Sequence, residues 1–183
     1  MSGTNIHRIL TLIFISILTI ALVYGLIHFY GVLGFTFAWV LNFLLMACVL
    51  AFTETLKSPL NFHYFSPRKW EQNGKVYEML GINIFRKILV WVGWEKMNKK
   101  SNPVEKNKKA IANLHYRTKQ SEFGHAIIFL IVLGFNIYVA LEYGFLKSLW
   151  LLVLNILFNL YPIFLQRFNR PRLERVLGLE RRE

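Results

Sequence analysis

The stretch ILTLIFISILTIALVYGLIHF, residues 9–29, decides the fold class, because its only titratable side chain is His28 near the far end. At a rise of about 1.5 Å per residue, a helix of this length crosses the roughly 30 Å hydrocarbon core of a bilayer. Arg8 before the stretch also fits a cleaved signal peptide. The stretch is longer than the apolar part of a signal peptide, and no small-residue cleavage site follows it. We therefore expect an uncleaved membrane span.

Three further apolar stretches of similar length follow, at residues 32–52, 123–141 and 148–165. Short connections separate the first stretch from the second and the third from the fourth, so each pair is predicted to form an antiparallel hairpin. The sequence therefore predicts an all-α integral membrane protein with four transmembrane helices in two hairpins. We expect residues 1–183 to form one membrane domain.

Composition supports this fold class. The 183 residues are 55% hydrophobic and 17% charged, yet the formal net charge is +12. A soluble domain carries about a quarter charged residues, and a basic nucleic-acid-binding domain is not this apolar. A soluble globule, a disordered chain and a disulfide scaffold are excluded, and we expect no nucleic-acid partner. The single cysteine, Cys48, lies in an apolar run and is expected to be packing.

The basic residues lie on one side of the predicted spans. Residues 53–122 hold 14 Lys and Arg, and the tail from Arg167 holds six more, whereas the two short turns contain only Lys147. Because cytoplasmic loops carry the excess of positive charge, we expect both termini and residues 53–122 in the cytoplasm. The basic tail at residues 166–183 is then cytoplasmic.

The middle segment contains a fifth apolar stretch, VYEMLGINIFRKILVWVGW, residues 76–94. Glu78, Arg86 and Lys87 lie inside it, and each charge at the bilayer centre costs about 2.5–3.5 kcal/mol. We expect an amphipathic interfacial helix here, with Trp91 and Trp94 at the level of the headgroups. The alternative is a buried helix of a small cytoplasmic cap.

The third span begins with TKQSEFGH, residues 118–125, and residues 110–120 are predicted to be a cytoplasmic helix that continues into it. Glu122 and His125 are three residues apart and share a helical face. His125 can act as a general base that Glu122 orients. The pair can also supply two metal ligands, or be purely structural. The other histidines show no ligand spacing with it, so we favour the base and expect no metal.

Polar residues also recur on one face of the fourth span, where Asn155, Asn159 and Gln166 are separated by helical offsets. Antiparallel packing would bring their cytoplasmic end level with His125. Such polar side chains can line a polar seam that opens at the cytoplasmic surface, or they can simply join helices by hydrogen bonds.

The span ends in LQRFNRPRL, residues 165–173, which adds further candidates for substrate binding: Arg167, Asn169, Arg170 and Arg172. Guanidinium groups bind phosphate through paired hydrogen bonds, so the three arginines are candidates to hold a phosphate-bearing ligand. Pro171 is predicted to end the helix and fix them near the cytoplasmic surface. No Walker loop, GxGxxG, GxSxG or HxxxxD pattern occurs in the sequence, which argues against nucleotide hydrolysis and hydride transfer.

The TKQSEFGH stretch and the LQRFNRPRL ending resemble the glycosyl-4,4′-diaponeurosporenoate acyltransferase family, which shows TK-x-x-E-x-x-H and QR-aromatic-NRPRL. Residues 73–90, NGKVYEMLGINIFRKILV, also resemble the family's G-K-aromatic stretch. The resemblance covers roughly residue 60 to the C-terminus. It implies a small bacterial enzyme of the cytoplasmic (inner) membrane that attaches a fatty acyl chain to the sugar of a carotenoid glycoside.

The resulting hypothesis is a membrane acyltransferase that moves an acyl group from a thioester to a sugar hydroxyl. In it the three arginines hold the phosphate of the acyl donor, and Asn155, Asn159 and Gln166 bind acceptor hydroxyls or the donor carbonyl. Its expected partners are membrane lipids, a glycolipid or carotenoid glycoside acceptor, and acyl-CoA or an acyl-carrier protein as donor. No cofactor is expected. The alternative is a non-enzymatic scaffold subunit whose basic cytoplasmic face binds anionic lipid or a partner protein. Another lipid-modifying transferase, such as a methyltransferase, lacks a visible cofactor loop.

Overall fold

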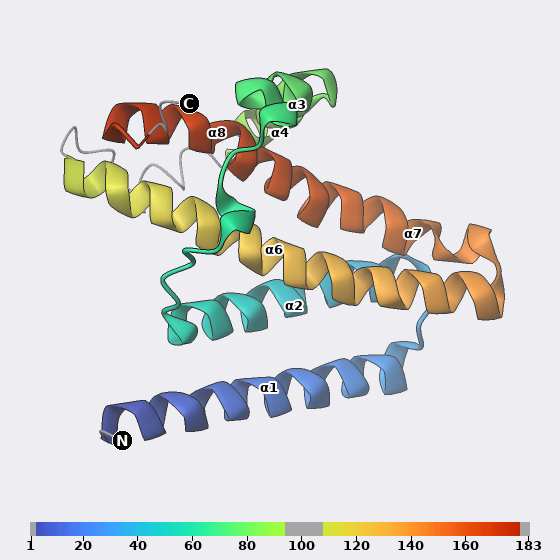
Figure 1. Ribbon diagram of the computed structural model, residues 1–183. Coiled ribbons are helices and arrows are strands. Elements are labelled where there is room, and N and C mark those ends of the chain that lie inside the picture. Colours follow the sequence, from blue (N-terminus) through green and yellow to red (C-terminus); the bar gives the residue numbers. More distant parts are fainter. Residues whose placement is uncertain (1–2, 94–107, 180–183) are drawn as a thin grey trace. The chain divides into compact units, whose positions relative to one another are not determined.

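The computed structural model describes residues 3–93 and 108–179, which are helical with short connections and contain no strand (Figure 1). The all-α prediction is confirmed over these residues. Trp94 and the end of the basic tail, residues 180–183, lie outside the described ranges.

Four helical stretches are long and apolar enough to cross a membrane. They are α1 (Gly3–Tyr30), α2 (Gly34–Leu56), α6 (Lys108–Tyr143) and the run Phe145–Leu177. The predicted number of candidate spans is therefore confirmed over the described residues, whereas the two-hairpin arrangement in a bilayer stays a prediction. Because α6 begins at Lys108 and has no break, the predicted entry of residues 110–120 into the third span is also confirmed.

The last long stretch is not a uniform α-helix. It consists of α7 (Phe145–Asn155), a π-helical turn η3 (Ile156–Leu160) and α8 (Tyr161–Leu177). π-helical turns are rare in proteins. Those that do occur are often found at functional sites. Here the turn comes directly after one of the predicted site asparagines and contains the other.

Pro171 lies inside α8, so the prediction that it ends the helix is wrong. A proline removes one backbone hydrogen bond, but residues on both sides of it are held from outside the helix. Arg170 bonds to Glu122, and Glu174 accepts a 3.1 Å hydrogen bond from the ring of His115. These contacts offset the missing bond and let the helix continue to Leu177.

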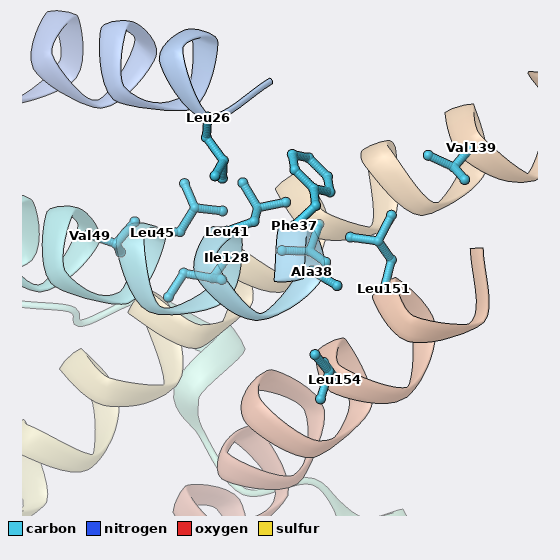
Figure 2. Packing of buried hydrophobic residues seen from close by; sticks show 11 residues of the cluster. Leu26, Phe37, Ala38, Leu41, Leu45, Val49, Ile128, Val139, Leu151 and Leu154 are labelled. Carbon is cyan, nitrogen blue, oxygen red and sulfur yellow. The ribbon is translucent and has the colours of Figure 1, made fainter. Parts of the chain in front are cut away.

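The described chain forms two compact units. The first contains residues 3–59 and 123–160. Its apolar core draws on α1, α2, α6 and α7, and Figure 2 shows Leu26 of α1 directed toward Leu41 and Leu45 of α2. The centroid of the Phe158 ring in η3 lies 5.3 Å from the ring centroids of both Trp39 and Phe43.

The second unit contains residues 60–93, 108–122 and 161–179, and thus joins the middle segment to the basic C-terminal helix. Its short helices are η1 (His63–Phe65), η2 (Lys69–Gly74), α3 (Lys75–Met79) and α4 (Ile82–Trp91). Gly74, at φ +98°, joins η2 to α3, where an added Cβ would lie 3.0 Å from the Phe168 ring.

The predicted single helix over residues 76–94 is instead two helices, α3 and α4, separated at Leu80 and Gly81. Gly81 has a φ of +82°, a conformation that glycine adopts without steric cost and that ends a helix. α4 buries Ile82 and Phe85, and the Phe85 ring stacks on Tyr161 of α8 at 5.2 Å. An interfacial position for α4 stays a prediction.

Candidate functional site

Four buried charged side chains of the second unit form a cluster, called here the Glu–Arg cluster: Glu71, Glu122, Arg167 and Arg170. Glu71 comes from η2, Glu122 from α6 and both arginines from α8. Two carboxylates face two guanidinium groups, so the cluster is neutral in sum. Charges this deeply buried persist in proteins only when they are paired.

Arg167 is the centre of the cluster. Its Nε donates to Glu71 Oε1 at 2.5 Å, and one terminal nitrogen donates to Glu122 Oε1 at 2.8 Å and to the Tyr64 carbonyl at 3.2 Å. The guanidinium also lies over the Tyr64 ring, 5.2 Å from its centroid. Arg167 therefore connects three separate segments of the chain.

Arg170 makes the matching contacts one helical turn later. It donates to Glu122 Oε2 and, at 2.9 Å, to the carbonyl of Phe65, whose ring lies 5.6 Å from the guanidinium carbon. Both oxygens of Glu122 thus accept hydrogen bonds from arginines, and its side chain is fully buried. The structure gives Glu122 a partner set that the sequence analysis did not expect.

Two tyrosines border the cluster. Tyr77 donates from its hydroxyl to Glu71 Oε1 at 2.7 Å. Burial, reinforced by this hydrogen bond to a carboxylate, raises the pKa of Tyr77 far above its ordinary value. Burial also raises the pKa of Tyr64, and the Glu122 carboxylate adds to the effect. Both phenols stay protonated at neutral pH and act as donors.

The other candidates from LQRFNRPRL have different surroundings. Arg172 is exposed, and its guanidinium carbon lies 4.4 Å from the centroid of the Phe168 ring. Exposed Arg86 of α4 lies 5.7 Å from the same centroid. Gln166 donates to the Ser121 hydroxyl at 3.2 Å, and Asn169 is half-buried. Two exposed guanidinium groups thus share one aromatic ring.

A second polar group lies inside the first unit and is called here the asparagine chain: Asn42, Asn155 and Asn159. All three side chains are buried. Asn159 donates to Asn42 Oδ1 at 2.7 Å and to Asn155 Oδ1 at 2.9 Å. Asn42 donates in turn to the Ala38 carbonyl at 2.8 Å, and Asn155 to the Phe129 carbonyl at 3.0 Å.

His125, which is half-buried on α6, lies at the end of this chain. Its Nδ1 is 3.4 Å from Asn159 Oδ1. The backbone carbonyl of Phe158, the neighbouring residue in η3, is a second acceptor beside the imidazole. The structure therefore brings together three predicted site residues, His125, Asn155 and Asn159, and adds Asn42.

Residues 61–179 match the family model described as glycosyl-4,4′-diaponeurosporenoate acyltransferase. The chain belongs to this acyltransferase family. The resemblance inferred from the sequence motifs is thereby confirmed, over nearly the range expected. No curated protein and no solved structure matches the chain.

The matched range contains most residues of both groups. The Glu–Arg cluster lies within it, as do His125, Asn155 and Asn159. Asn42 belongs to α2 and lies before it. The family name implies acyl transfer in the formation of carotenoid glycoside esters. Among the described residues of this family member, no group of three or more metal-ligating side chains could hold a metal ion.

Sequence reasoning missed three residues of these groups. Asn42 gave a signal, because an amide inside an apolar span needs a hydrogen-bond partner, but its partner is more than a hundred residues away. Glu71 gave none, since it lies in a polar stretch where a charged residue is ordinary, and Tyr77 gave none, since an aromatic residue is ordinary in the apolar stretch at residues 76–94. Only the fold shows that they contact Arg167.

Proposed function

We propose that this protein transfers a fatty acyl group from a thioester donor to a sugar hydroxyl of a carotenoid glycoside or related glycolipid. Family membership supports the acyl transfer and the carotenoid glycoside class. The donor, the acceptor hydroxyl and the residues that act on them are the proposal. Four helices able to span a bilayer suit an acceptor that is itself dissolved in lipid.

His125 is proposed as the general base. The observation that carries this role is its hydrogen bond through Nδ1 to Asn159, which leaves Nε2 for the acceptor. Nε2 takes the proton of the sugar hydroxyl as that oxygen attacks the thioester carbonyl. The tetrahedral intermediate then expels the thiolate, the C–S bond breaks, and the imidazolium returns the proton to sulfur. The products are the sugar ester and the free thiol.

The donor phosphate is proposed to bind at Arg172 together with Arg86. Both guanidinium groups are exposed and lie over the Phe168 ring. Arg167 and Arg170, the other donor-binding candidates, have their guanidinium groups bound to Glu71 and Glu122, so a phosphate would have to displace a buried carboxylate. Because both oxygens of Glu122 bind these arginines, Glu122 is not the residue that orients His125 in this proposal. Asn159 has that role instead.

The test is acyl transfer by the purified protein in lipid nanodiscs, with a long-chain acyl-CoA and a glycosylated carotenoid, read by mass spectrometry. His125→Gln should lower turnover by about 10²–10⁴-fold, as expected for loss of a general base. The matched control is His115→Gln, because His115 bonds to Glu174 within the second unit and should leave turnover near that of the wild type.

Two results would contradict the proposal. Normal turnover of His125→Gln would remove the catalytic role of the imidazole. Absence of any ester with wild-type protein, from acyl-CoA and from acyl-carrier protein alike, would favour the scaffold function instead.

A further inference from the structure

The hydrogen bonds of the asparagine chain have a fixed direction. The carbonyls of Ala38 and Phe129 can only accept, so Asn42 and Asn155 must turn their NH₂ groups toward them. Their Oδ1 atoms then face Asn159, which must donate both of its amide hydrogens. The amide orientation of all three side chains therefore follows from two backbone carbonyls at the ends.

This direction extends to His125. Once Asn159 has donated both amide hydrogens, the atom that it presents to the imidazole is Oδ1, an acceptor. The ring nitrogen that faces Asn159 must therefore carry the proton, and in a neutral imidazole the other nitrogen then has the lone pair.

We infer that Asn42 is a positioning residue: with Asn155 it fixes Asn159, and Asn159 holds His125 as the Nδ1–H tautomer with Nε2 free to accept a proton. This inference rests on the proposed function for its catalytic meaning. The hydrogen-bond geometry that supports it is independent of any substrate. Asn42 gains a role although it lies outside the range that matches the family.

Amides suit this position. In serine hydrolases an aspartate holds the histidine, and the wrong tautomer there costs about 10⁴-fold in turnover. An ionised carboxylate inside an apolar helix bundle is expensive, whereas an amide chain that ends on backbone carbonyls keeps the same direction without a net charge. Substitution of Asn159 by Asp would place carboxylate oxygens against Asn42 Oδ1 and Asn155 Oδ1.

The first test is ¹⁵N NMR of histidine-labelled protein in nanodiscs, at about pH 8, above the ordinary titration range of imidazole. A difference spectrum with His125→Gln assigns the signals of His125. We expect a protonated Nδ1 and an unprotonated Nε2 in the wild type. Asn42→Leu, which keeps the shape but removes the amide, should populate both tautomers because Asn159 can then rotate.

The second test is kinetic, and its matched control is Asn136→Leu. Asn136 is also a buried amide of the first unit, but it donates to the Ser148 carbonyl and has no bond to the asparagine chain. Asn42→Leu should lower kcat by about two- to ten-fold with both KM values unchanged, because about half to a tenth of the population then has the productive tautomer. Asn136→Leu should change neither kcat nor the tautomer.

Each outcome decides the inference separately from the proposed function. An Nε2–H tautomer of His125 in the wild type overturns it. Wild-type tautomer populations or wild-type kcat in Asn42→Leu overturn it as well. Normal turnover of His125→Gln would instead refute the base while leaving the tautomer measurement valid.

Discussion

Two arginines have opposite surroundings within a single turn of α8. Arg170 is almost fully buried and bound to Glu122, whereas Arg172, two positions later, is exposed over the Phe168 ring. Successive residues of a helix point about 100° apart, so a shift of two positions moves a side chain to the opposite face. The NRPR stretch therefore combines a structural arginine with one that is available to a ligand.

Arg170→Gln is expected to lower the free energy of unfolding by about 3–5 kcal/mol, because it leaves Glu122 with an unpaired buried carboxylate oxygen. Thermal unfolding in detergent, followed by circular dichroism, measures the change. The control is Arg172→Gln, which removes an exposed guanidinium and should leave the melting temperature near that of the wild type. Equal stability of the two variants would contradict the assignment.

Arg172→Gln should instead act on the donor. Loss of a charge-assisted hydrogen bond to phosphate is worth about 1.5–3 kcal/mol, so the KM for acyl-CoA should rise by about ten-fold or more. Turnover at saturating donor should change little. Arg86→Gln should give the same pattern, since both groups lie over one ring. An unchanged donor KM in both variants would move the phosphate site elsewhere.

At the scale of elements, α4 has an apolar face that no described part of the second unit covers. Ile84, Ile88 and Trp91 are exposed at helical spacing, although Ile82 and Phe85 are buried on the opposite side. An exposed apolar stripe next to Arg86 and Lys87 is typical of a helix that lies in the membrane interface.

A nitroxide label at position 84 should accordingly be more accessible to dissolved oxygen than to a water-soluble relaxation agent in nanodiscs. The matched position is Lys75 of α3, which is exposed and should show the reverse preference. Cys48 is replaced by Ser in both proteins so that only the introduced cysteine reacts. Equal aqueous access at the two positions would place α4 in a cytoplasmic cap, away from lipid.

The junction of η2 and α3 depends on the absence of a side chain at Gly74. Its φ of +98° disfavours other residues, and a Cβ there would lie 3.0 Å from Phe168 Cδ2. Gly74→Ala should therefore cost about 1–2 kcal/mol of backbone strain and a further 1–3 kcal/mol for displacement of the ring. Gly31 has a φ of +67° but nothing within 4 Å, so Gly31→Ala should show the strain alone. Thermal unfolding of the two variants separates the backbone strain from the cost of displacing the ring. Equal losses of stability would contradict a close contact with Phe168.

At the scale of the whole molecule, the two most basic regions of the chain, the middle segment and the C-terminal helix, belong to one compact unit. The positive-inside rule predicts that these two regions share the cytoplasmic side. Lys147, near the start of α7, belongs to the opposite side in this topology.

Single cysteines at positions 87, 172 and 147, introduced into a Cys48→Ser background, test this topology in intact cells. An impermeant maleimide should label position 147 from outside, whereas positions 87 and 172 should react only after the membrane is permeabilised. Labelling of position 87 in intact cells would contradict the four-span topology.

The sequence by itself determined the helical class, the four candidate spans and the family, the last through residues 118–125 and 165–173. Hydropathy and motifs can be read in this way because each is a property of neighbouring residues. The sequence could not separate Arg170 from Arg172, join Asn42 to Asn159, or give Glu122 its arginine partners. Those pairings depend on which helical faces approach each other, which only tertiary packing decides. A buried polar group must find a partner, but the partner's position along the chain is free.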